Sequence, residues 1–359
     1  KSSYQPFFSI LIPTFNEASL IRKRIENLLT LEYPHDRYEI LVIDSGSTDG
    51  TAEVVQELVQ TRREKVPPLR LVRENERRGK GSAVRTGRSL AGGEIILVSD
   101  ANATFHPGVL GILGAPFADP EIGGVGGRYC VGNPGQKYTQ GASFYWDLEC
   151  LMRNGEAALD SACLFHGEIN AWRKDLVEPD PSILCEDLDL ALQIRRSGNK
   201  IGYEPRAIVY EPAATTTRDI IIQRKKVASG TLQIIGKNIG YFLVNPGWYN
   251  WLIFPSHKIL PLLTPFLLVL VLLLYLAIGN VQVIFGHVVV CMVGLGIILV
   301  GLRSVLRTEP CGGARHFPGR LIPLLKYVLL NEVLVGLGWW DFLTGRYTVL
   351  WEKVESTRT

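Results

Sequence analysis

The sequence lacks the signature motifs of several common classes of protein. Its six cysteines include no CxxC pair, so the usual ligand spacing of a structural zinc site is absent. No GxGxxG follows the first apolar run and no GxxxxGK[ST] occurs, which argues against a dinucleotide oxidoreductase and against a P-loop NTPase. The net charge of +3 is too small to indicate a nucleic-acid surface. What the chain does have is a very uneven distribution of charge along its length.

Charge is missing altogether from two long runs in the C-terminal part. Residues 259–278 and 281–302 contain no Asp, Glu, Lys or Arg, and each run can span a hydrocarbon core about 30 Å thick. A third apolar segment, 321–343, contains Lys326 and Glu332, so it predicts either a third span or a helix that lies in the membrane interface. We therefore expect a transmembrane domain over residues 251–345.

The connection between the second and third runs is rich in arginine. It carries Arg303, Arg307, Arg315 and Arg320 against a single acidic residue. By the positive-inside rule this connection is cytoplasmic, and the residues before the first span lie on the same side. The pattern predicts a multi-pass protein of the cell membrane whose large N-terminal domain faces the cytoplasm.

Short β-rich runs alternate with helical patterns over the first 100 residues. FFSILIP, YEILVIDS, LRLVRE and EIILVSD are expected strands, and this alternation predicts a parallel sheet with helices on both faces. Ligands of such sheets bind beyond the carboxyl ends of the strands. Polar residues stand at these ends, which is a nucleotide-binding layout: Thr14, Asn16, Glu17, Asp44, Asp100 and Asn102.

Three acids open a predicted helix in LCEDLDLALQIRRSG, residues 184–198. Glu186, Asp187 and Asp189 suit the positive end of the helix macrodipole, and Gly198 suits a left-handed C-cap. Taken alone, the segment favours a structural role for these acids. A catalytic role needs support from the rest of the chain.

That support comes from a series of motifs that occur in order within residues 7–235. They are SILIPTFNE, LVIDSGSTDGT, GKGSAVRTG, LVSDANATF, CEDLDLALQIRRSG and YEPRAIVYEPAATTTRDIIIQRKKVASG. Together they resemble an inverting family 2 glycosyltransferase of the GT-A fold, in the cellulose-synthase-like branch. The resemblance implies an α/β, Rossmann-like nucleotide-diphospho-sugar transferase domain, followed by amphipathic interfacial helices and a small transmembrane helix domain.

The resemblance also implies which residues bind the donor. In the family, the first-strand motif and the Asp after the second strand hold the base and ribose of a sugar nucleotide, and a basic residue lies near the diphosphate. Asp44 also suits a turn-capping role, and a Gly-Lys-Gly loop is often only a loop. The matching positions here are Pro13, Thr14, Glu17, Asp44, Lys80 and Asp100.

The metal motif of the family is altered in this chain. SDAN stands where the family has Asp-x-Asp, so Asp100 matches the first acid and Asn102 replaces the second. Oxygen ligands and a diphosphate favour Mn²⁺ or Mg²⁺, although an Asn oxygen brings no negative charge. His106 and His166 are further candidate ligands, and each is more often an ordinary structural histidine.

CEDLDL matches the family's catalytic segment, with Cys185 in place of Thr. The resemblance implies that Asp187 is the general base, which takes the proton of the attacking acceptor hydroxyl. Glu186 supports it, and Asp189 is expected to be a structural acid of the first helical turn.

The acceptor side also departs from the pattern of processive members. QRKKV stands where they carry Gln-x-x-Arg-Trp, so Gln223 and Lys226 match and Val227 replaces the Trp. Losing that stacking platform weakens the case for a polymer synthase. Residues 215–250 are expected to form amphipathic interfacial helices, with Arg224 and Lys226 toward phosphates.

These expectations combine into one function. The chain is expected to be a metal-dependent membrane glycosyltransferase that moves a sugar from a nucleotide sugar to a polyprenyl or dolichyl phosphate or a lipid-linked glycan. GDP-mannose is the favoured donor, because the chain resembles short dolichyl-phosphate mannosyltransferases, and UDP-sugars follow closely. A UDP-sugar-dependent polysaccharide synthase and an inactive sugar-nucleotide-binding membrane protein stay open as alternatives. The expected domains are 1–214 (catalytic), 215–250, 251–345 and a tail, 346–359.

Overall fold

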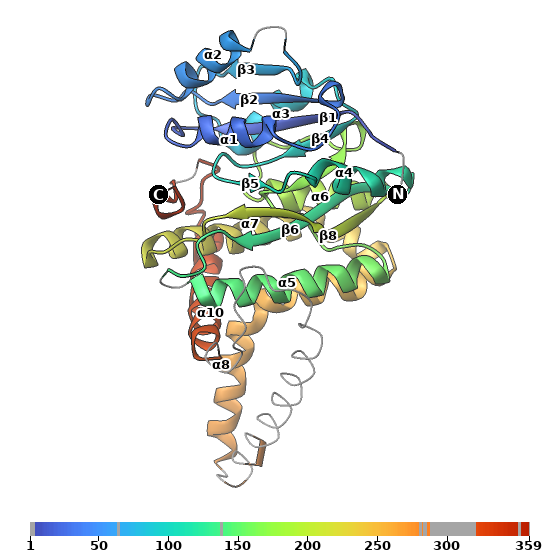
Figure 1. The fold of residues 1–359 in the computed structure, drawn as a ribbon. Coiled ribbons are helices and arrows are strands. Elements are labelled where there is room, and N and C mark those ends of the chain that lie inside the picture. Colours follow the sequence, from blue (N-terminus) through green and yellow to red (C-terminus); the bar gives the residue numbers. More distant parts are fainter. Residues whose placement is uncertain are drawn as a thin grey trace.

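The centre of the protein is one eight-stranded sheet in the order β3-β2-β1-β4-β7-β6-β8-β5 (Figure 1). This computed structural model describes residues 4–62, 65–136, 139–279, 282, 286–287, 321–350 and 353–358. The strands are β1 (Phe8–Thr14), β2 (Tyr38–Asp44), β3 (Leu69–Arg73), β4 (Ile95–Val98), β5 (Thr104–Phe105), β6 (Ile122–Val131), β7 (Asn170–Arg173) and β8 (Lys200–Glu211).

The first half of the sheet is parallel, as the alternating pattern predicts. β1 pairs with β2 and β4, and β2 pairs with β3. The register sets Thr14 beside Asp44, so these two polar residues meet at the carboxyl edge of the sheet.

The second half of the sheet, for which the sequence predicts no strand direction, is mixed. β7 runs antiparallel to both β4 and β6, while β6 and β8 are parallel. The alternation that sets strand direction extends only through the first four strands. Beyond Ser99 the strand-to-helix order is irregular, and the four-residue β7 enters between β4 and β6 in the opposite direction.

Helices cover both faces of the sheet, because successive side chains of a buried strand point to opposite sides. Ile10 and Ile12 of β1 belong to one core cluster and Leu11 to the other. The first cluster is covered by α1 (Ile21–Leu29), α2 (Thr51–Thr61) and α4 (Val109–Gly114), and the second by α3 (Lys80–Leu90) and α6 (Glu186–Arg196). Short 3₁₀ turns lie at His35–Arg37, Ala115–Ala118, Lys174–Leu176 and Glu355–Thr357.

The predicted helix with three opening acids is α6. Glu186, Asp187 and Asp189 lie in its first turn, Cys185 precedes it without a side-chain cap, and Gly198 follows it at φ +87°. This positive φ is the left-handed conformation that glycine adopts readily.

Longer helices lie on the side of the sheet domain from which α8 projects (Figure 1). They are α5 (Thr139–Leu159), α7 (Thr217–Val244), α8 (Leu260–Ile278) and α10 (Leu321–Leu343), with π-helical turns at Tyr249–Ile253 and Pro255–Ile259. Thr216 caps α7 by accepting a hydrogen bond from the Asp219 amide at 3.2 Å. Ala228 and Leu232 of α7 pack with Leu262 of α8 and Trp339 of α10.

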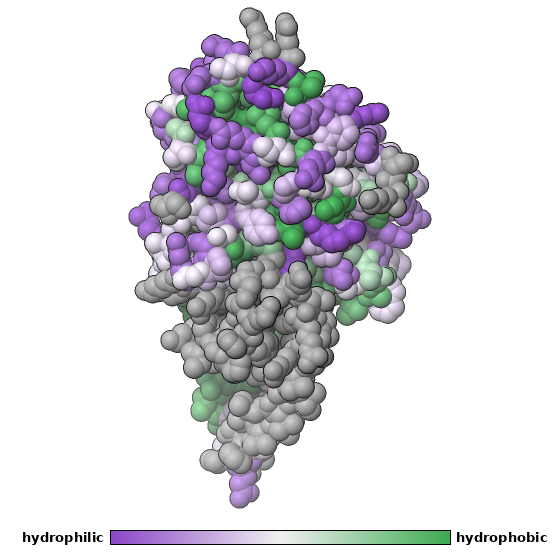
Figure 2. Space-filling view, in the orientation of Figure 1, coloured by the Kyte–Doolittle hydropathy of each residue, from purple (hydrophilic) through white to green (hydrophobic). Residues whose placement is uncertain are grey.

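One helix in the described part of the chain, Tyr249–Ile278, is long and apolar enough to cross a membrane. It contains the first predicted span, 259–278, and only 6% of its most apolar window is buried. The second predicted span, 281–302, lies almost wholly outside the described residues. Figure 2 shows mostly hydrophilic residues on the visible surface of the sheet domain.

The third predicted span, 321–343, is a helix but not a membrane-spanning candidate in the described residues, so a multi-pass arrangement is not supported. Its C-terminal half makes polar contacts with α7. In α10, Asp341 pairs with Lys225 of α7 at 2.6 Å, and the Gly338 carbonyl accepts a hydrogen bond from Ser229 at 3.0 Å. The helix therefore packs along α7.

Candidate active site

A cavity of about 350 Å³ opens at the carboxyl ends of β1 and β4, between the sheet and helices α6 and α7. It is where the strand-end rule predicts a ligand site. All the predicted site residues except Asp44 line it: Pro13, Thr14, Glu17, Lys80, Asp100, Asn102, Glu186, Asp187, Gln223, Arg224 and Lys226.

The end of β1 forms the predicted donor side of the cavity. Thr14 and Glu17 are buried, and Thr14 Oγ1 donates to the Ile43 carbonyl at 3.2 Å. Asp44 is 3% exposed and lies beneath this surface. Its Oδ2 accepts the Ser47 amide at 3.3 Å, and its buried Oδ1 has no hydrogen-bond partner. Asp44 is thus beside the cavity rather than in its wall.

Lys80 begins α3 and joins two predicted motifs. Its Nζ lies 2.7 Å from Asp100 Oδ1 and 3.0 Å from Glu186 Oε1. Burial would lower the pKa of Lys80, but these two carboxylates raise it well above its usual range. Lys80 therefore stays charged and ties the end of β4 to the start of α6.

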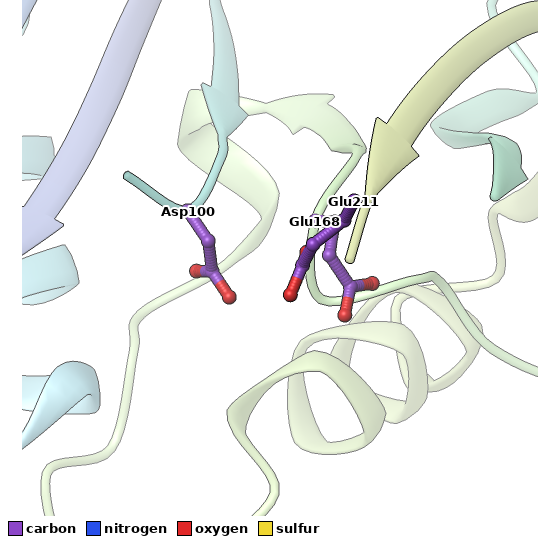
Figure 3. A group of neighbouring side chains, drawn as sticks. All are labelled: Asp100, Glu168 and Glu211. Atoms are coloured by element: carbon purple, nitrogen blue, oxygen red, sulfur yellow. The ribbon is translucent and has the colours of Figure 1, made fainter. Parts of the chain in front are cut away.

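Three carboxylates meet on one side of the cavity. Oxygens of Asp100, Glu168 and Glu211 lie within 4.8 Å of one another (Figure 3). Burial, together with Glu168 and Asp100, raises the pKa of Glu211 well above its usual range. Asn102 donates from Nδ2 to Glu211 Oε1 at 2.9 Å.

The acidic cluster fits a hard divalent cation. Carboxylate and amide oxygens are the ligands that Mn²⁺ and Mg²⁺ prefer. Two buried oxygens beside the cluster, Glu211 Oε2 and Asn102 Oδ1, have no hydrogen-bond partner. Sequence reasoning missed Glu168 and Glu211, although the latter ends the quoted run YEPRAIVYE.

The two candidate histidines differ in position. His166 lines the cavity, stacks on Tyr129 at 5.1 Å and hydrogen-bonds Glu168 Oε2 through Nδ1 at 2.8 Å. Burial lowers the pKa of His166. His106 is outside the cavity wall and its Nδ1 accepts the Gly108 amide at 3.3 Å, which is a loop contact.

Asp187 stands in the first turn of α6 and faces the cavity. No hydrogen bond or ion pair holds its carboxylate in the described part of the chain. Burial and the neighbouring charge of Glu186 raise the pKa of Asp187 to about 6. Asp189, by contrast, accepts Gln193 Nε2 at 2.7 Å and lies 3.6 Å from Lys237, as expected of a structural acid.

Basic residues line the cavity on the side of α7 and α8. Arg224 lies over the Tyr145 ring at 5.4 Å, and burial lowers the pKa of Lys226 to about 8. Lys258, from the π-helical turn before α8, lines the same wall. Sequence reasoning missed Lys258, because it lies 32 positions after Lys226 at the edge of the apolar run.

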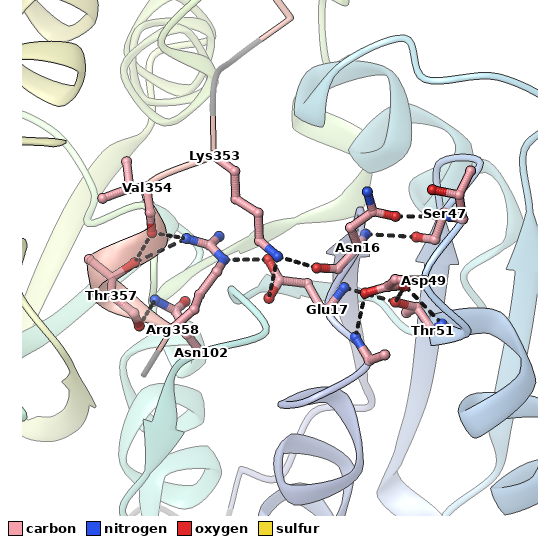
Figure 4. A network of polar contacts seen from close by, with 12 residues as sticks. Asn16, Glu17, Ser47, Asp49, Thr51, Asn102, Lys353, Val354, Thr357 and Arg358 are labelled. Carbon is pink, nitrogen blue, oxygen red and sulfur yellow. Dashed lines mark hydrogen bonds and ion pairs between the residues drawn. The ribbon is translucent and has the colours of Figure 1, made fainter. Parts of the chain in front are cut away.

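The C-terminal tail reaches the donor side of the cavity (Figure 4). Arg358 Nε lies 2.6 Å from Glu17 Oε1, and Lys353 Nζ donates to the Asn16 carbonyl. Asn102 Nδ2 also approaches the Thr357 carbonyl at 3.4 Å. The sequence offered no signal for these contacts, which join residues more than 250 positions apart.

Comparisons with known proteins identify the family of the chain. The family model for glycosyl transferase family 2 matches residues 9–177, and that for glycosyl transferase family group 2 matches residues 95–302, more than half of the chain. The probable glycosyltransferase YdaM of Bacillus subtilis is 28% identical over 255 residues, which cover 66% of this chain and 58% of the relative.

Other relatives carry more specific names. The beta-monoglucosyldiacylglycerol synthase of Nostoc is 28% identical over 64% of this chain and 49% of its own length. A dolichyl N-acetyl-alpha-D-glucosaminyl phosphate 3-beta-D-2,3-diacetamido-2,3-dideoxy-beta-D-glucuronosyltransferase of Methanococcus voltae is 37% identical over 27% of this chain and 29% of its own. The chain spans about half the length of the curated relatives it matches.

A solved structure extends the likeness to almost the whole chain. The mannosyltransferase PcManGT from Pyrobaculum calidifontis, in complex with GDP-Man and Mn²⁺, superposes with a TM-score of 0.69 at 24% identity, covering 96% of this chain and 89% of that one. At this identity the likeness shows the fold. With the family matches, it shows that the chain belongs to the family 2 group of glycosyltransferases and has their GT-A fold.

Proposed function

We propose that the protein is a membrane-bound, metal-dependent transferase that moves a mannosyl group from GDP-mannose, with inversion, to a polyprenyl-phosphate-type lipid. Membership of family 2 supports a nucleotide-sugar donor. The fold of a mannosyltransferase solved with GDP-Man and Mn²⁺ supports the choice of donor and metal.

The position of Asp187 carries the proposal. In the described residues its carboxylate has neither a hydrogen bond nor an ion pair. Four other carboxylates of the cavity each have at least one: those of Asp100, Glu168, Glu186 and Glu211. A pKa of about 6 leaves it ionised near pH 7 and close to the value at which a base is most effective.

The reaction that Asp187 supports is a single displacement. The acceptor oxygen bonds to C1 of the donor sugar while the bond from C1 to the diphosphate oxygen breaks. The electron pair leaves with the nucleoside diphosphate, and Asp187 takes the proton of an acceptor hydroxyl or of a phosphate monoanion. Lys80, held between Asp100 and Glu186, is positioned to offset charge on the leaving diphosphate.

A divalent cation is part of the proposal. When bound, it would neutralise charge on the diphosphate oxygens. Asp100 and Asn102 are the expected ligands, and the nearby carboxylates of Glu168 and Glu211 fit the same ion.

The acceptor assignment depends on charge near the apolar helix. Arg224, Lys226 and Lys258 line the cavity on the side from which α8 begins, and α8 is largely exposed. Cations at that depth suit a lipid phosphate better than an uncharged lipid headgroup.

A transfer assay with purified full-length protein in detergent tests the proposal. We expect labelled GDP-mannose and Mn²⁺ to give a lipid-extractable mannosyl product with polyprenyl phosphate and much less with diacylglycerol. Turnover with UDP-sugars alone would contradict the donor. Preference for diacylglycerol would contradict the acceptor, and long polymer without lipid product would favour a polysaccharide synthase.

A further inference from the structure

The second acid of the metal motif is missing from the sequence, and a distant residue stands in its place. We infer that Glu211 supplies the negative charge that Asn102 lacks, so that a divalent cation binds between Asp100 and Glu211. The inference rests on the proposed metal-dependent function and adds a metal ligand that the SDAN motif does not contain.

The fold brings this carboxylate to the motif from the far end of the sheet. Asn102 follows β4, whereas Glu211 is the last residue of β8, three strands away in the sheet order. Asn102 Nδ2 nevertheless donates to Glu211 Oε1 at 2.9 Å, and Glu211 lies with Asp100 in the cluster of Figure 3. The Glu211 carboxylate is therefore hydrogen-bonded to Asn102, the residue that stands in the place of the missing acid.

A second observation points to a cation. Glu211 is 8% exposed, yet its Oε2 has no hydrogen-bond partner, and Asn102 Oδ1 beside it has none either. Leaving a buried acceptor unsatisfied is unfavourable, and more so for a charged group. Two such oxygens side by side match the ligand type of Mn²⁺ or Mg²⁺.

The neighbouring acid, Glu168, is a weaker substitute. Its Oε2 is hydrogen-bonded to His166 at 2.8 Å, which already compensates part of its charge. Lys80, which pairs with Asp100 and Glu186, forms no ion pair with Glu211 in the described residues. Glu211 is thus the carboxylate of the cluster that keeps a buried oxygen without a hydrogen bond or ion pair within the described structure.

A charge-relocation experiment tests the inference. We would measure Mn²⁺ binding by electron paramagnetic resonance, in the presence of GDP or UDP, for the wild type, E211Q, N102D and N102D/E211Q. Glu211→Gln should weaken Mn²⁺ binding by about 10–100-fold, the usual effect of losing a partner in a metal site. The double variant should recover most of that loss, because it returns the charge to the motif.

A matched control lies on the same strand. Glu204 of β8 pairs with Arg206 at 2.7 Å and does not line the cavity, so E204Q should bind Mn²⁺ as the wild type does. E211Q should unfold no more readily than the wild type without metal, because it removes an uncompensated buried carboxylate.

Three outcomes would overturn the inference: unchanged Mn²⁺ affinity in E211Q, failure of N102D/E211Q to recover the loss seen in E211Q, or no Mn²⁺ binding by the wild type. Because binding is read without turnover, each of these results is distinct from a failure of the transfer assay. If the protein transferred sugar at the full rate in EDTA, the metal requirement would be rejected, whereas the proposed transfer reaction would not.

Discussion

At the scale of single residues, the ionised form of Asp187 that the proposed reaction needs is also the form that destabilises the folded protein. The pKa of this carboxyl is about 6 in the folded protein against an ordinary value of 3.8. An acid with a raised folded pKa favours folding most below its unfolded pKa. That contribution is lost as the pH rises through the folded pKa. Near pH 7.5 the ionised Asp187 is therefore a destabilising group, which fits the role of base that is proposed for it.

Asp187→Asn separates the two effects. Transfer should fall by about 10²–10⁴-fold, the usual contribution of a general base, while nucleotide binding stays near normal. The melting temperature should rise at pH 7.5 and change little at pH 4, where both side chains are neutral. Asp189→Asn, in the same helical turn, is the control and should keep near-normal turnover. Near-normal turnover in D187N would show that another group is the base.

The same carboxyl sets an expected pH profile. With a pKa of about 6, kcat/KM should increase about tenfold per pH unit below pH 6 and level off above it. The profile is measured with saturating metal, so that protonation of the metal ligands does not contribute. A profile that is flat from pH 5 to pH 8 would contradict the assignment of Asp187.

Sequence reasoning found the residues that lie in contiguous motifs and missed those that the fold brings in from a distance. Asp187, Lys80 and Asp100 each belong to a short run with its own pattern. Glu211 lies within one of the motifs but has no ligand pattern around it, and Lys258 lies outside them; they reach the cavity from the end of β8 and from the turn before α8. Their roles depend on long-range placement, which periodicity does not encode.

At the scale of elements, α7 presents two faces that can be tested separately. Arg224 and Lys226 line the cavity, whereas Lys225 points to α10 and pairs with Asp341 at 2.6 Å. The predicted helix is therefore cationic toward the cavity and packed on the other side.

Arg224→Ala and Lys258→Ala should raise the KM for a polyprenyl phosphate. Each loses a charge-assisted contact worth about 1.5–3 kcal/mol, or roughly 10–150-fold. Donor hydrolysis without acceptor should change much less. Lys225→Ala is the matched control, because it removes a neighbouring charge that faces away. An equal KM increase in all three variants would point to general damage rather than to acceptor binding.

The C-terminal tail is a second element whose contacts predict a measurable effect. Arg358 compensates Glu17, whose pKa burial raises even with this partner present. Arg358→Ala should therefore release the tail, which hydrogen exchange would detect as faster exchange of the Ser356 amide, now bonded to Asp219 Oδ2 at 3.0 Å. Arg346→Ala should leave the exchange unchanged, because the Arg346 side chain forms no hydrogen bond or ion pair in the described structure. Equal exchange in R358A and the wild type would mean that other contacts hold the tail.

The predicted helices and strands agree with the structure where a single hydrophobic pattern dominates the segment. β1 to β4 follow from buried apolar runs, and α6 follows from an acidic first turn and a glycine after its last turn. The direction of β7 did not, because a four-residue strand has too little pattern to fix its partners. The third predicted span, 321–343, is not supported by the described residues. Apolar side chains that pack on another helix and apolar side chains that face lipid give the same hydropathy, and α10 makes contacts with α7 as well as carrying an apolar sequence.

At the scale of the whole molecule, the described part of the chain joins a polar sheet domain to one long exposed apolar helix. Figure 1 shows α8 projecting away from the sheet domain. Lys258, just before this helix, lines the cavity. An acceptor lipid held in a membrane by its chain would reach the cavity from this side, past Lys258.

This architecture predicts that α8 anchors the protein. Leu272 is 58% exposed in the middle of the apolar helix, where an arginine costs about 2.5–3.5 kcal/mol on insertion. Leu272→Arg should shift the expressed protein from the carbonate-washed membrane fraction toward the soluble or aggregated fraction. Leu159→Arg is the control, because Leu159 is 48% exposed at the end of α5 in the catalytic domain and should not change the partition. If L272R stayed in the washed membranes as fully as the wild type, α8 would not be the anchor, and the access route proposed for the lipid acceptor would lose its basis.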